Sequence, residues 1–108
     1  MEVKIKSPAV DDEGYLVNPM EWSEEQAEAF ARQENIQLTE DHWDALRFMR
    51  DFYLEHQVAP DVRFVIRHLA ERMGPASRNA IFQLFPYGYV KQACKIAGMK
   101  RPRAWSTG

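Results

Sequence analysis

Hydrophobic and polar positions alternate with two different periods along the chain, and the difference predicts where strands and helices lie. Near the start, Val3 and Ile5 alternate with lysines, a period of two that is typical of a half-buried strand. A polar stretch follows, and then the β-favouring run Tyr15-Leu16-Val17. These segments predict a small N-terminal β-hairpin with a long loop. Because a hairpin alone is marginal in water, we expect it to pack on helices.

Beyond residue 22 the apolar positions recur at helical spacing. Ser23 and Gln26 have the spacing of a capping box and predict a helix over about 23–34. Thr39, followed by two acidic residues, predicts the start of a second helix that Pro60 ends. The apolar positions of this second helix cover more than half of its circumference, which indicates a central helix packed by several neighbours.

The second half of the chain predicts three shorter helices and an arm. Asp61 and Ser77 are suited to cap the first two, and Gly98 is suited to the position just after the last. Pro102 makes continued helix beyond that point unfavourable. The expected ranges are about 61–73, 77–84 and 89–97 for the helices, 1–98 for the mostly α-helical domain and 99–108 for the arm.

Composition narrows the class of protein further. The chain has 108 residues, of which 45% are hydrophobic, and this suffices for one compact core. No apolar run approaches the length that a membrane span needs, and the first residues lack the apolar segment of a secretory signal. One cysteine cannot form an internal disulfide, so a cytoplasmic protein is the expectation.

Charge is distributed unevenly between the two halves. Residues 1–59 carry 14 acidic and five basic side chains, whereas residues 60–108 carry two acidic and nine basic ones. The basic half is suited to an anionic partner, either an acidic protein surface or nucleic acid. The two halves attracting each other explains the same asymmetry without any partner, and both interpretations stay open.

Most catalytic signatures are absent from the sequence. It has no glycine-rich phosphate loop, no zinc-type cysteine pair and no nucleophile elbow, and its three histidines do not have ligand spacing. We therefore expect no cofactor and no metal site. Cys94 stands apart, because on a helical wheel it falls at the edge of an apolar stripe with Lys91 and Lys95 beside it. Nearby cations favour the reactive thiolate, but a free cysteine is also often a small buried hydrophobe.

Several motifs, in order and with preserved spacing over nearly the whole chain, resemble the DsrC/TusE (DsvC) sulfur-relay family. They are Asp12-Glu13-Gly14-Tyr15-Leu16, the helix from Asp41-His42-Trp43-Asp44 to Arg47-Phe48-Met49-Arg50-Asp51-Phe52-Tyr53, Leu84-Phe85-Pro86 and Lys91-Gln92-Ala93-Cys94-Lys95-Ile96-Ala97-Gly98. The resemblance implies an orthogonal bundle of about five helices with an N-terminal β-hairpin and a C-terminal arm. It also implies work in tRNA thiolation or in dissimilatory sulfur metabolism.

The resemblance further implies roles for particular residues. Such proteins carry their principal reactive thiol as a penultimate cysteine on the arm, and DsrC-like members add a second cysteine in the preceding helix, which Cys94 matches. At the position of the principal cysteine this chain has Trp105. The implied function is a persulfide carrier through Cys94, supported by Lys91 and Lys95, and at most a sulfurtransferase component rather than a stand-alone enzyme.

Two alternatives to the carrier stay open. The first is a non-catalytic regulatory or partner-binding member of the family, with sulfur-relay or sulfite-reductase-type proteins as partners. The second is nucleic-acid binding through residues 60–108, whereas no membrane is expected. The candidate docking residues on the arm are Lys100, Arg101, Arg103 and Trp105.

Overall fold

The computed structural model of the chain describes residues 9–100, and these form a mostly helical fold without any strand. No helix among them combines the length and the apolar character that crossing a membrane requires. The elements in chain order are η1 (Pro19–Glu21), α1 (Glu24–Gln33), α2 (Glu40–His56), α3 (Val62–Met73), η2 (Gly74–Ala76), α4 (Ser77–Leu84), η3 (Tyr89–Ala93) and α5 (Cys94–Ile96).

Side-chain caps start the first three helices, as the sequence predicts. The Ser23 hydroxyl accepts a hydrogen bond from the Gln26 backbone N–H at 3.1 Å and begins α1. Asp61 accepts from the Arg63 N–H at 2.8 Å and begins α3. The predicted cap at Ser77 is wrong. Ser77 is already helical and buried, because the 3₁₀ turn η2 leads directly into α4 and leaves no place for a cap.

The predicted β-hairpin is not confirmed. Val3 and Ile5 lie outside the described residues, and Leu16 forms a single antiparallel bridge with Val10. The turn between them is organised by a carboxylate, since Asp11 Oδ1 accepts from the backbone N–H groups of Glu13 and Tyr15 at 2.9 Å each. Two N–H groups are therefore bonded within the turn itself. The bridge still places Leu16 in the core, where it is fully buried.

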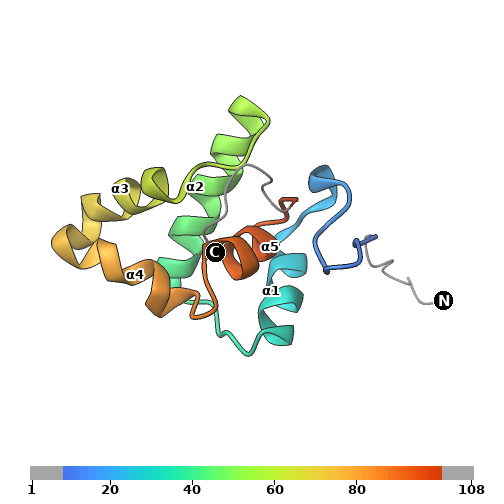
Figure 1. Cartoon of the computed structure of the whole chain (residues 1–108), viewed down its shortest axis with the longest axis horizontal. Helices are drawn as coiled ribbons and strands as arrows, with labels where there is room; N and C mark the ends of the chain where they lie inside the picture. Colours follow the sequence, from blue (N-terminus) through green and yellow to red (C-terminus); the bar gives the residue numbers. More distant parts are fainter. Residues whose placement is uncertain (1–8, 101–108) are drawn as a thin grey trace.

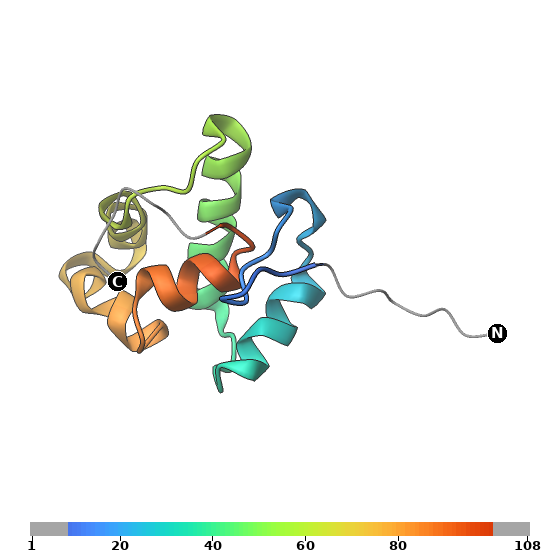
Figure 2. The same cartoon turned by 45° about the vertical axis from the view of Figure 1, so that its right-hand side comes forward.

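The last helical segment lies in the middle of the molecule (Figures 1 and 2). It packs against α1 on one side, α2 crosses behind it, and the α3–α4 pair lies on its other side. The sequence predicts one α-helix over 89–97, but the structure divides it into the π-helical segment η3 and the short α5. The count of five full helices is therefore not confirmed. The largest fully buried side chains of the core include Phe85, Leu16, Leu46, Met49, Leu69, Ile81, Ile96 and Met99.

Candidate functional site

Cys94 lies at the junction of η3 and α5, and none of its surface is exposed. Its backbone N–H donates to the Tyr89 carbonyl, five residues back, which is the bonding of a π-helix. In an α-helix, side chains five positions apart point in directions that differ by roughly 140°. The wider π-helical turn instead brings Cys94 toward the face of Tyr89. The sequence predicts Cys94 at the edge of the apolar stripe, but the structure buries it completely. The prediction is wrong because the helical wheel assumes uniform α-helical geometry.

The surroundings of Cys94 keep its sulfur protonated. Burial raises the pKa of the thiol to about 12, and a hydrogen bond with the Tyr89 hydroxyl offsets only part of that rise. This hydroxyl has only one proton, and the Pro60 carbonyl, in the loop between α2 and α3, competes for it. Burial also raises the pKa of Tyr89, so this hydrogen-bond donor persists at physiological pH. A thiolate is therefore disfavoured as long as the helix stays closed.

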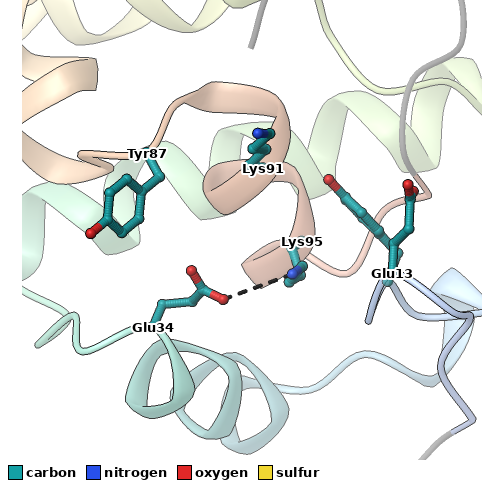
Figure 3. A pocket seen from close by; sticks show the side chains of 6 residues that line it. Glu13, Glu34, Tyr87, Lys91 and Lys95 are labelled. Carbon is teal, nitrogen blue, oxygen red and sulfur yellow. Dashed lines mark ion pairs between the residues drawn. The ribbon is translucent and has the colours of Figure 1, made fainter.

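Lys91 and Lys95 lie on the same helical segment as the buried Cys94, but their side chains reach the surface. Lys95 Nζ is 3.8 Å from a carboxylate oxygen of Glu34 and 5.2 Å from the centre of the Tyr15 ring. Lys91 is exposed. Both lysines line a pocket of about 360 Å³ that Figure 3 shows from close by. The other lining residues are Glu13, Tyr15, Glu34 and Tyr87, and Cys94 is not among them.

Glu34 and Gln92 were not foreseen in the sequence, yet they tie the last segment to α1. Glu34 follows the last residue of α1, and its carboxylate accepts from Gln92 Nε2 at 2.9 Å on one oxygen and pairs with Lys95 on the other. Gln92 is buried, and its carbonyl oxygen accepts from the Tyr87 backbone N–H. The one available signal was a glutamine inside an otherwise apolar stripe, which requires partners when it is buried.

The C-terminal end of α5 is closed by a Schellman turn. The N–H of Gly98 donates to the Lys95 carbonyl at 3.0 Å, and the N–H of Met99 donates to the Cys94 carbonyl at 2.9 Å. Gly98 has a φ of +79°, as the sequence predicts for the residue after the helix. Its missing side chain also allows the Trp22 indole to pack directly on the backbone, where a Cβ would overlap the ring.

Two further side chains, both unforeseen in the sequence, bind the free carbonyls at this end. Trp22 Nε1 donates to the Ile96 carbonyl at 2.9 Å. Arg50, from α2, donates to the Ala97 carbonyl at 3.1 Å and to the Pro19 carbonyl at 3.0 Å. Its guanidinium lies 4.8 Å from the centre of the Trp22 ring. We call Arg50 and Trp22 the clamp of the last helix.

The candidate docking residues of the arm begin where this turn ends. Lys100 is the last described residue and is exposed. Arg101, Arg103 and Trp105 lie outside the described residues, so their predicted role stays a prediction.

Acidic and basic halves of the chain bind each other in the described residues. Arg72 on α3 donates to Asp41 at 2.7 Å and to Asp44 at 3.4 Å, both on α2. His68 lies 2.9 Å from the same Asp44, and the Lys95–Glu34 pair is a third such link. Part of the basic charge of the second half is therefore paired with acidic side chains of the first half. This supports the interpretation that the two halves attract each other.

His42 serves as a structural group. His42 Nδ1 accepts from the Thr39 N–H at 3.0 Å, so Nε2 carries the proton and donates to the Leu84 carbonyl at 2.8 Å. Burial lowers the pKa of His42, while the bond to Leu84 opposes that shift. Within residues 9–100, no group of three histidine, cysteine or acidic side chains is placed to hold a metal ion.

The fold and the site together define a small helical scaffold that fixes one cysteine and the base of a C-terminal arm at its centre. The family model described as "DsrC like protein" matches residues 2–104 of this chain. The chain belongs to the DsrC-like family.

Relatives and solved structures agree with this assignment. The chain is 40% identical over 104 residues to the sulfurtransferase TusE of Pectobacterium atrosepticum, which covers 94% of this chain and 95% of that protein. It is 41% identical over 99 residues to TusE of Escherichia coli K12, which covers 90% and 91%. The crystal structure of the oxidized gamma-subunit of dissimilatory sulfite reductase (DsrC) from Archaeoglobus fulgidus matches with a TM-score of 0.83, 40% identity and coverage of 94% and 95%.

Proposed function

We propose that this protein works in a sulfur relay and that Cys94 carries the sulfur in a state in which the last helix has opened. The observation that carries the proposal is its close similarity, over nearly the full length, to proteins named as sulfurtransferase TusE and DsrC. Cys94 is the one cysteine of the chain, so any sulfur bound through a cysteine must be bound there. A cytoplasmic location is part of the proposal.

The chemical step is a transfer of sulfane sulfur. The Cys94 thiolate attacks the terminal sulfur of a donor persulfide, the S–S bond of the donor breaks, and the donor leaves as a thiolate. A new S–S bond forms on Cys94, and no net oxidation or reduction occurs. Because burial raises the pKa of this thiol to about 12, the closed protein cannot supply the nucleophile, and opening must precede the step. In the open state Lys91 and Lys95 would favour the anion.

Loading with a persulfide donor tests the carrier role. We expect intact mass to show one added sulfur atom on the natural protein and none on Cys94→Ser, with a rate that follows the rate of Cys94 alkylation. A reducing agent should remove the added sulfur. The proposal fails if the thiol is alkylated under native conditions but takes up no sulfur from the same donor that loads a TusE relative.

The alternative function is partner binding without sulfur transfer, which requires no accessible thiol and is therefore compatible with the complete burial of Cys94. In this version the protein binds a sulfur-relay or sulfite-reductase-type protein through its arm. Trp105 then occupies the place that a cysteine of a relative would enter. The basic residues Lys100, Arg101 and Arg103 would provide the charge contacts.

Binding to a purified sulfite-reductase-type or sulfur-relay protein separates the two functions. Trp105→Ala should weaken the affinity about tenfold or more if the indole is a central anchor, whereas Cys94→Ser should leave it unchanged. Equal affinity of all three proteins would contradict the docking role.

A further inference from the structure

Arg50 is an unusual residue for its position, because it is a cation with only 8% of its surface exposed. A buried charge is unfavourable unless other groups compensate for it. No carboxylate within hydrogen-bond or ion-pair distance of Arg50 is found among the described residues. Its partners are two backbone carbonyls, Pro19 and Ala97, and the faces of two aromatic rings, Trp22 at 4.8 Å and Tyr53 at 5.9 Å.

The groups that compensate for this charge come from three separate segments. The Pro19 carbonyl belongs to η1, Tyr53 belongs to α2, and the Ala97 carbonyl belongs to the end of the last helix. Carbonyls at a helix C-terminus carry partial negative charge, so a guanidinium there is electrostatically favourable. Arg50 therefore ties the last helix to α2 and η1 at the point where the arm begins.

Trp22 completes the arrangement from the other side. Its indole N–H binds the Ile96 carbonyl, its ring packs on Gly98, and its face supports the Arg50 guanidinium. Trp22 and Arg50 thus occupy two successive carbonyls of the last turn. If either is lost, a buried carbonyl is left without its partner, and the turn of residues 94–99 becomes the least stable part of the helix.

The same turn begins at Cys94 itself. The Met99 N–H is bonded to the Cys94 carbonyl, and the Met99 side chain is 1% exposed. Met99 lines a surface pocket of about 350 Å³ together with Ala59, which precedes Pro60. Pro60 accepts the hydrogen bond from Tyr89, the residue that contacts Cys94. Because the Met99 N–H holds the Cys94 carbonyl, unwinding the turn frees the backbone of the residue that carries the sulfur.

We propose that Arg50 and Trp22 are positioning residues that set how often the last helix opens, and hence how often Cys94 can react. The inference deepens the proposed carrier function and rests on it for its biological meaning. Its physical content, the control of access to Cys94, is measured with an alkylating reagent and not with a sulfur donor. A failure of sulfur loading and a failure of the clamp are therefore distinguishable.

The test is the rate at which iodoacetamide alkylates Cys94 in the folded full-length chain. Arg50→Lys keeps the charge but loses the planar fork, and Trp22→Phe keeps a ring but loses the N–H donor. Each should raise the alkylation rate about fivefold or more, because leaving a buried group without its hydrogen bond shifts an opening equilibrium by at least about that factor. Hydrogen exchange at the Met99 amide should accelerate in parallel.

Arg47→Lys is the matched control. Arg47 lies one turn earlier on the same helix, with its guanidinium 5.6 Å from the centre of the Trp43 ring. Its side chain is 62% exposed and pairs with Glu24, and within the described residues it is not seen to bind a carbonyl. We expect this variant to keep the alkylation rate of the natural protein. Val65→Ala, in the buried face of α3, controls for general destabilisation. In this variant the Met99 amide should exchange only as fast as the loss of global stability requires.

Two results would overturn the inference. One is an unchanged alkylation rate in a folded Arg50→Lys or Trp22→Phe protein. The other is a rate that rises only in proportion to the loss of global stability, as measured by urea unfolding. If Arg50→Lys does not fold, Trp22→Phe alone still decides between these outcomes.

Discussion

At the C-terminal ends of α4 and α5, side chains from other segments bind the backbone carbonyls. The two ends differ in the chemistry of those side chains. At the end of α4, the Leu84 carbonyl accepts from His42. At the end of α5, the carbonyls of Ile96 and Ala97 accept from Trp22 and Arg50. Histidine changes its charge near neutral pH, whereas indole and guanidinium do not. Protonated His42 still donates to the Leu84 carbonyl but can no longer accept from the Thr39 N–H. Acid should therefore loosen the contact of His42 with the start of α2 and leave the end of α5 in place.

The difference indicates which part of the protein should be loosened by a change in pH or salt concentration. The α3–α4 pair is joined to α2 through His42 and through pairs such as Arg72–Asp41, which are partly exposed. The last segment is held by buried groups, including Tyr89 and Gln92. The thiol therefore lies in a region that is attached mainly by buried groups, with the Lys95–Glu34 pair as its one ionic link among the described residues.

The largest effect is expected where the last helix meets Trp22. Gly98→Ala forces a side chain into a backbone with a φ of +79° and into the Trp22 indole. We expect a loss of about 3 kcal/mol in the free energy of unfolding, from strain and overpacking together. Gly74→Ala, which has a φ of +62° and open space around it, should lose about 1–2 kcal/mol from strain alone. Equal losses in urea unfolding would show that the contact with Trp22 is unimportant.

A smaller effect is expected at the hydrogen bond between Tyr89 and Pro60. Tyr89→Phe leaves the buried Pro60 carbonyl without its donor and should reduce the free energy of unfolding by about 2 kcal/mol. Tyr87→Phe, at a side chain that is 72% exposed, should change stability little. Thermal or urea unfolding of both variants checks the contrast, and a harmless Tyr89→Phe would argue against a firmly attached last segment.

The comparison of helix ends predicts a pH dependence with a definite sign. The folded protein holds the pKa of His42 below its ordinary value of 6.5. Between that lowered pKa and pH 6.5, the unfolded chain therefore binds more protons than the folded protein does. The contribution of His42 is fully present above pH 6.5 and decreases as the pH falls toward the lowered pKa. His42→Gln should flatten this part of the stability curve, as measured by urea unfolding across that pH range.

Hydrogen exchange locates the same pH effect. As the pH falls, the amide of Thr39, which is bonded to His42 Nδ1, should lose protection before the amide of Met99 does, after correction for intrinsic exchange. Loss of protection at both amides together would contradict the difference between them.

The smallest effect is expected at the surface of the α2–α3 contact. Arg72 is half exposed, so Arg72→Ala should cost less than about 1 kcal/mol in the free energy of unfolding, although it bonds two aspartates. High salt should reduce the difference further, because these charges are accessible to screening ions. A loss well above that value in urea unfolding would mean that the α3–α4 pair is held as firmly as the last helix.

Much of the fold could be predicted because local signals determine it. Ser23, Thr39 and Asp61 cap helices where the sequence predicts, and Gly98 follows the last one. The similarity to the DsrC/TusE family, inferred from ordered motifs, is confirmed by the comparisons with known proteins.

The site was harder to predict, because long-range contacts and an irregular turn determine it. Trp22 and Arg50 are more than 40 residues from the carbonyls of the last helix that they bind, and no local pattern marks them. The environment of Cys94 depends on one π-helical turn, which a uniform helical wheel cannot represent. Leu16 could be expected in the core, but its pairing with Val10 follows from the carboxylate of Asp11.

The π-helical turn before Cys94 means that this stretch holds one residue more than an α-helix of the same rise would need. A surplus residue gives the backbone two ways to close. If the Cys94 N–H selected the carbonyl four residues back, every side chain from 94 onward would rotate by roughly 100° relative to the core. The direction of the sulfur thus depends on which carbonyl a single N–H chooses, and deleting one residue between Gly88 and Cys94 would remove that choice.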